Sequence, residues 1–97
     1  MALDTEFDIR LEMEIATLRQ SVLQRRESQA FLDAQELAQW YNHSVGLPRY
    51  SNACRASLPR IRRELSQALQ AFPRGSDGFQ TYMAELLSSI DALLRKR

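Results

Sequence analysis

The first 44 residues contain neither glycine nor proline, yet they carry two apolar stripes on different sides of a helical projection. The first stripe falls within an arc of about 80° at 100° per residue and consists of Phe7, Leu11, Ile15, Leu18 and Val22. The second stripe lies opposite and consists of Ile9, Met13, Ala16 and Leu23, followed by Ala30, Phe31, Ala34, Leu37, Ala38 and Tyr41. A helix that buries one face needs one stripe, so the second stripe predicts a second surface to bury against.

The two stripes differ in length, which suggests different roles. The first becomes polar at Arg25 and Gln29, whereas the second continues to Tyr41. We therefore interpret the long stripe as the intramolecular core and the short stripe, Phe7 to Val22, as a surface for another chain. The alternative is that both stripes are covered within one monomer, because small bundles often pack helices around a central one.

Two breaks divide the rest of the chain. Ser44 to Pro48 contains Gly46 and Pro48, which end a helix, and the second break runs from Pro73 to Gly78. Between and after them, apolar residues recur at spacings of three and four. The sequence predicts one all-α domain over residues 1–97, a small bundle of three main helices over about 5–43, 57–72 and 77–95, assembled as a homodimer.

The first of these helices carries an open question. As one long or kinked helix it would span about 60 Å and overhang its own bundle. Two helices would need a turn near Arg25 to Ser28, where the sequence offers no glycine, proline or asparagine. We favour the single helix.

Net charge, cysteine content and arginine content predict the partners, the compartment and the source of the protein. Net charge is +1, so no strong field draws the chain to nucleic acid or anionic lipid. The single Cys54 predicts a reducing cytoplasm, and the acidic N-terminus predicts neither a signal peptide nor a membrane anchor. Twelve of the thirteen basic residues are arginine, which is typical of a GC-rich bacterial genome.

Arginines cluster between residues 49 and 63, where no acidic residue occurs. Guanidinium groups bind carboxylate and phosphate alike, so the sequence offers these as contacts for an acidic partner or phosphate: Arg55, Arg60, Arg62 and Arg63. Glu36 to Ala38, followed by Val45 to Pro48 and this helix, loosely resembles a helix-turn-helix unit. Its connection is longer than in that motif, and Pro59 interrupts the second helix. DNA binding through Arg49 to Arg63 is therefore the alternative function.

Catalytic, metal and cofactor signatures do not stand out. His43 and Cys54 are the only histidine and cysteine, and nothing predicts that they meet or that a third group orients the histidine. One histidine and one cysteine also fall short of a zinc site. We expect no enzymatic activity and no cofactor.

The function that these patterns favour is regulation by protein binding. Apolar helical faces need only a complementary surface and no chemistry. We expect a small adaptor or inhibitor, for example an anti-activator of a transcription factor, that binds itself and a larger protein. Trp40 projects away from the long stripe and joins the interface residues on that basis; aromatic side chains often anchor interfaces.

Overall fold

The computed structural model describes residues 2–95, with side chains from Thr5 to Arg95, and this part of the chain is helical without a strand. Four α-helices follow one another: α1 (Ala2–Leu23), α2 (Glu27–Val45), α3 (Ser51–Ala71) and α4 (Asp77–Arg95). A short 3-10 turn, η1 (Pro48–Tyr50), joins α2 to α3. The all-α prediction is thus confirmed, with four helices rather than three main ones.

The single long helix is wrong, because the chain turns back at Arg25. Arg25 has a φ of 58°, in the left-handed region. The N–H of Arg26 donates to the carbonyl of Ser21 at 2.9 Å, and the N–H of Arg25 donates to that of Val22 at 3.1 Å. This pair of bonds is the Schellman arrangement that ends many helices, with arginine in the position usually held by glycine.

Backbone strain opposes a turn without glycine, and side-chain burial favours it. A non-glycine residue in the left-handed conformation costs about 1–2 kcal/mol. The turn folds α1 back on α2 and allows four large side chains to be buried, each contributing about 1.5–3 kcal/mol. Burial therefore outweighs the strain, and the longest dimension of the molecule is 41 Å instead of the length of a continuous helix.

Helix α4 begins where the sequence predicts it, whereas α3 begins earlier than predicted. Helix α3 starts at Ser51, six residues before the predicted start, and continues through Pro59, which has no N–H to give to the carbonyl of Arg55. Helix α4 starts at Asp77 as predicted, and the hydroxyl of Ser76 accepts a hydrogen bond from the N–H of Phe79 at 3.2 Å. The loop before α4 approaches Glu27, whose carboxylate accepts the N–H of Ser76 at 2.6 Å.

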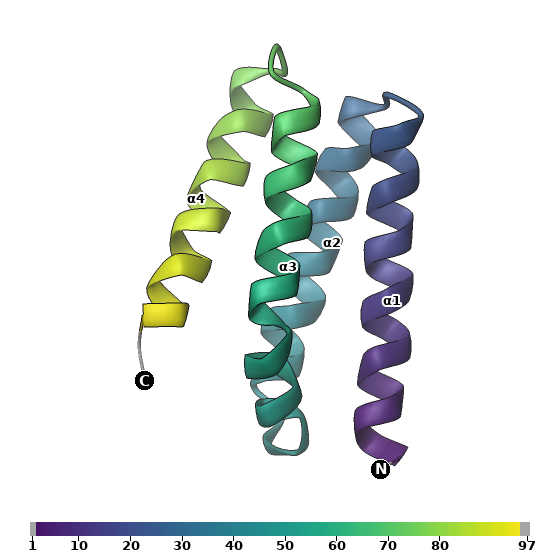
Figure 1. Cartoon of the computed structure of the whole chain (residues 1–97), viewed down its shortest axis with the longest axis vertical. Coiled ribbons are helices and arrows are strands. Elements are labelled where there is room, and N and C mark those ends of the chain that lie inside the picture. The colour runs from purple at the N-terminus through teal and green to yellow at the C-terminus, as the bar shows by residue number, and fades with distance from the viewer. Residues whose placement is uncertain (1, 96–97) are drawn as a thin grey trace.

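Helices α2 and α3 lie in the middle of the molecule, with α1 on one side and α4 on the other (Figure 1). Consecutive helices run antiparallel (Figure 1), and α1 packs on both α2 and α3. The thickness of 17 Å is about that of two packed helices, so this bundle is flattened.

Aromatic clusters close the two ends of the core. At one end Phe7 on α1 packs on Trp40 and Tyr50, with ring centroids 4.9 and 5.6 Å apart. At the other end the rings of Phe31, Phe72, Phe79 and Tyr82 join α2, α3 and α4. The second cluster fixes the N-terminal half of α4, whereas the C-terminal half of α4 diverges from α3 (Figure 1).

Candidate protein-interaction surfaces

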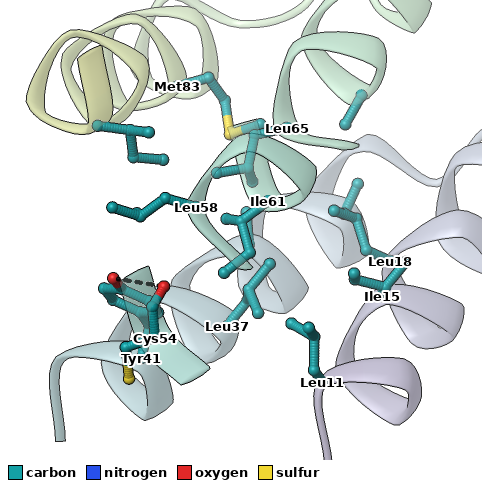
Figure 2. Close-up of a cluster of buried hydrophobic side chains, with 14 of the residues drawn as sticks. Leu11, Ile15, Leu18, Leu37, Tyr41, Cys54, Leu58, Ile61, Leu65 and Met83 are labelled. Atoms are coloured by element: carbon teal, nitrogen blue, oxygen red, sulfur yellow. Dashed lines mark hydrogen bonds between the residues drawn. The ribbon is translucent and has the colours of Figure 1, made fainter. Parts of the chain in front are cut away.

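The short stripe predicted to bind another chain lies in the core of the monomer. Phe7, Leu11, Ile15 and Leu18 are each at most 3% exposed. Figure 2 shows Leu11, Ile15 and Leu18 directed from α1 toward Leu37 and Ile61. Val22 is partly buried against the same cluster. This stripe is therefore closed to a partner in the folded monomer, and the alternative that the monomer covers it applies.

Trp40 is also less accessible than the sequence indicated. Its ring stacks on Phe7, and the guanidinium of Arg10 lies over the ring at 5.9 Å from the centroid. The indole is half-buried, and it seals the end of the core beside Phe7. The residue packs inside its own chain rather than projecting as an isolated anchor.

A groove opens where the C-terminal half of α4 diverges from the bundle. This α4 groove encloses about 600 Å³ beside α2 and α3. Its walls are formed by Tyr41, Val45, Ser51, Arg55, Leu58, Leu93 and Leu94. A second hollow of about 230 Å³ continues it along α4, and both share Tyr41, Leu58 and Leu93. The lining is mainly apolar, as is typical of sites that hold another molecule.

Two apolar side chains at the mouth of the α4 groove face solvent. Val45 is 48% exposed and Leu93 is 46% exposed. Leu58 and Tyr41 form the floor, and in Figure 2 they lie on the side of the core away from α1. The groove therefore has a packed floor and a loose apolar rim, which a partner can cover without unfolding the bundle.

The α4 groove has few polar groups. The hydroxyl of Tyr41 donates to the carbonyl of Cys54 at 3.2 Å (Figure 2). Burial raises the pKa of the Tyr41 phenol to about 12, so it keeps its proton and remains a donor at neutral pH. Arg55 is the charged residue of the lining, and among the residues with described side chains it has no ion-pair partner. A carboxylate from a partner would find a free cation here.

The second exposed apolar surface is the outer face of α1. Ile9 is 57% exposed, Met13 is 60% exposed and Leu23 is 76% exposed, and Ala16 lies between them on the same face. These residues belong to the long stripe that the sequence placed in the core. The part of that stripe on α2 is indeed core, since Ala30, Ala34 and Leu37 are at most 1% exposed. The part on α1 points outward because Arg25 rotates one helix relative to the other.

Two of the four candidate arginines are neutralised within the chain. Arg60 forms an ion pair with Glu12, and Arg62 forms one with Asp91 at 2.5 Å. Hydrogen bonding to these arginines lowers the pKa of both carboxyls. Arg63 is exposed, and like Arg55 it has no such partner among the described side chains. The four candidate arginines thus divide into two paired and two unpaired cations, which weakens the case for a phosphate-binding surface.

One acidic residue that the sequence did not single out is buried beside this cluster. Glu64 is 3% exposed, and its carboxylate accepts two hydrogen bonds from the guanidinium of Arg19, at 2.8 and 2.5 Å. The hydrogen bond that Arg19 donates to Glu64 raises the pKa of Arg19. This bidentate pair joins α1 to α3 and stabilises their packing.

His43 and Cys54 occupy different environments. His43 is exposed in the last turn of α2, whereas Cys54 is fully buried in α3. Burial raises the pKa of the Cys54 thiol, which makes it a weaker nucleophile. Within residues 2–95, no group of three or more histidine, cysteine, aspartate or glutamate side chains is placed to hold a metal ion.

None of the helices in the described range is long and apolar enough to cross a bilayer. Neither a protein-family model, nor a curated protein, nor a solved structure matches the chain. Any inference about function therefore rests on the exposed surfaces described above.

Proposed function

We propose that this chain is a small protein-binding regulator, an adaptor or inhibitor whose α4 groove takes the apolar face of a short helix from a larger protein. The observation that carries the proposal is the α4 groove itself. It combines an apolar floor, an exposed apolar rim at Val45 and Leu93, and a cation at Arg55. Helix-in-groove recognition uses such a surface.

The dimensions of the groove favour a short helix. Its lining on α2 runs from Leu37 to Val45, and its lining on α4 runs from Leu86 to Leu94. Each stretch covers eight residue steps, or roughly 12 Å at 1.5 Å per residue. Two to three turns of a partner helix fit along this length, with apolar residues spaced three and four apart facing Leu58 and Leu93.

The charge of the groove lining favours an acidic residue beside the apolar row of the partner helix. Arg55 has no ion-pair partner among the described side chains, and no aspartate or glutamate lines the groove. A glutamate or aspartate beside the apolar row of the partner would pair with Arg55, whereas a lysine there would be repelled. The proposed occupant is therefore an amphipathic helix with an acidic flank.

A chain with such a groove can regulate a larger protein by binding alone. A chain that covers the apolar face of a helix prevents that helix from packing on its usual partner. An anti-activator that masks a helix of a transcription factor is the most concrete form of this function, because it requires binding alone.

A displayed library of amphipathic peptides of about four helical turns tests the proposal. Peptides enriched on the wild-type chain should carry apolar residues at spacings of three and four with an acidic flank, and bind with micromolar dissociation constants. Leu93→Glu and Val45→Glu should each weaken binding at least tenfold, and Arg55→Glu should reverse the preference for acidic over lysine-flanked versions. Leu32→Glu is the matched control, since Leu32 is 54% exposed and lies outside the groove lining.

Two results would overturn the proposal. One is enrichment that is equal on the wild-type and Leu93→Glu chains, since binding would then not use the groove. The other is a shift of duplex DNA at physiological salt that weakens steeply with added salt and is lost in Arg55→Glu and Arg63→Glu. That result would favour the nucleic-acid alternative instead.

A further inference from the structure

The outer face of α1 carries a row of residues with the spacing of a coiled-coil seam. Its positions follow one another at intervals of four, three, four and three: Ile9, Met13, Ala16, Gln20 and Leu23. This alternation is the 3.5-residue repeat by which two helices keep the same faces in contact. All five residues are exposed, and the chain itself does not cover them.

The charges of α1 are distributed unequally along its length. Its N-terminal half carries Glu6, Asp8, Glu12 and Glu14 against Arg10, whereas its C-terminal end and the following turn carry Arg19, Arg25 and Arg26. Two copies laid side by side in parallel would bring the acidic halves together. Laid antiparallel, the acidic half of each copy would face the basic end of the other.

From this seam and this charge polarity, we propose that the chain forms a symmetric homodimer in which the outer faces of two α1 helices pack antiparallel. The partner is thus a second copy of the same chain, and the contact does not depend on the α4 groove. A two-fold axis makes the interface self-complementary, because each contact occurs twice.

One register pairs the centre of the seam. It places Met13 of each copy against Ala16 of the other, so that a large side chain meets a small one. Ile9 then lies opposite Gln20 of the second copy, and Leu23 lies opposite Glu6. Glu12 flanks the seam of one copy and Arg19 flanks that of the other, with the two residues offset by roughly 3 Å along the helices, within reach of a new ion pair. Both side chains are more than half exposed, so each retains room for a second partner beside its intramolecular one.

The position of α1 makes this pairing compatible with the proposed function. Helix α1 lies at one edge of the flattened bundle, and α4 lies at the other (Figure 1). A dimer formed through α1 therefore leaves both α4 grooves open, one at each end of the assembly. Three large apolar side chains per copy form a small contact, so we expect a micromolar dissociation constant.

Sedimentation of the full chain over a range of concentrations from about one to several hundred micromolar tests the dimer. The wild type should pass from monomer to dimer within this range. Met13→Glu and Leu23→Glu should weaken association at least tenfold while circular dichroism and thermal midpoint stay close to those of the wild type. Leu32→Glu places the same charge at an equally exposed site on α2 and should leave association unchanged.

Disulfide trapping tests the orientation. Ile9→Cys and Gln20→Cys should cross-link when the two variants are mixed, because the antiparallel register places them opposite each other. Each variant alone should not form a cross-linked pair, since its two cysteines would lie roughly 16 Å apart along the seam at 1.5 Å per residue. Cross-links within each single variant and none in the mixture would show parallel pairing and overturn the antiparallel dimer. A wild type that stays monomeric throughout, or a Met13→Glu chain that dimerises as well as the wild type, would overturn the interface.

Discussion

The inner and outer apolar rows of α1 lie on the same helix and differ greatly in exposure. The inner row, from Phe7 to Leu18, is at most 3% exposed, whereas Ile9, Met13 and Leu23 of the outer row are 57% to 76% exposed. Both rows carry large apolar side chains at helical spacing, four in the inner row and three in the outer row, where Ala16 and Gln20 stand between them. The inner row is thus the more apolar face. The turn at Arg25 directs it toward α2 and α3.

The turn acts by setting the rotation of α1 relative to α2. In a continuous helix the outer row of α1 would line up with the core row of α2 at Ala30, Ala34 and Leu37. The left-handed residue at 25 ends this alignment, and the inner row meets α2 and α3 instead. One backbone conformation thus exchanges the roles of two faces.

Substitutions in the two rows should differ greatly in their effect on the free energy of unfolding. Leu18→Ala should lower the free energy of unfolding by about 2–5 kcal/mol, because it leaves a cavity in a packed core. Leu23→Ala, on the same helix, should change it by no more than about 0.5 kcal/mol when the protein is dilute enough to be monomeric. Urea denaturation of the two variants measures the difference. Equal losses would contradict the assignment of the inner row to the core.

A second prediction addresses the turn itself. Arg25→Gly should raise the free energy of unfolding by up to about 1 kcal/mol, because glycine adopts a positive φ without the steric strain of a side chain. The gain is limited by the loss of the hydrogen bond from the Arg25 guanidinium to the carbonyl of Ala71. Thermal and urea unfolding measure the change. In a continuous helix the same glycine would lower stability by about 1 kcal/mol, so the sign of the effect distinguishes the two arrangements.

The last helix was predictable because its signals are local, whereas the start predicted for α3 lay six residues after the observed start at Ser51. Proline and glycine mark the break after Phe72, and the apolar period of the last segment gives the observed start at Asp77. The turn at Arg25 was the less favoured alternative because no glycine, proline or asparagine marks it, and its stability comes from burial elsewhere. Every interface residue assigned to the first stripe inherited that error in rotation.

The α4 groove was not predictable from the sequence, since it depends on how far α4 tilts from α3. A partial signal was available. The apolar face of α4 spans about 140° on a helical projection, more than one neighbouring helix covers, and Leu93 remains 46% exposed as a result. The outer row of α1 also had a readable signal in its 3.5-residue spacing.

The ion pair between Arg62 of α3 and Asp91 of α4 predicts a small, pH-dependent effect on the free energy of unfolding. Hydrogen bonding to Arg62 lowers the pKa of Asp91 in the folded chain. A carboxyl with a lowered folded pKa stabilises the fold above its unfolded pKa, about 4, and this stabilisation disappears as the pH falls through the folded value. Asp91→Asn should therefore be slightly less stable than the wild type at pH 7, and this difference should shrink as the pH falls below about 4 and through the folded pKa of Asp91.

Urea titrations at several pH values measure this difference between the two chains. Because both side chains are about 40% exposed, added salt should reduce it further. A difference that persists unchanged at low pH would show that Asp91 acts through something other than its charge.

The unequal anchoring of α4 has a consequence for motion. Phe79 and Met83, near its N-terminus, are fully buried, and the ring of Phe79 packs on Phe31 and Phe72. Near its C-terminus the helix is held by Ile90, by the partly buried Leu94 and by a solvent-exposed ion pair. Local opening requires less free energy where fewer apolar contacts must be broken. The last turns of α4 can therefore separate from the bundle while its first turns stay packed in the aromatic cluster. Helix α4 then moves about the end that carries Phe79.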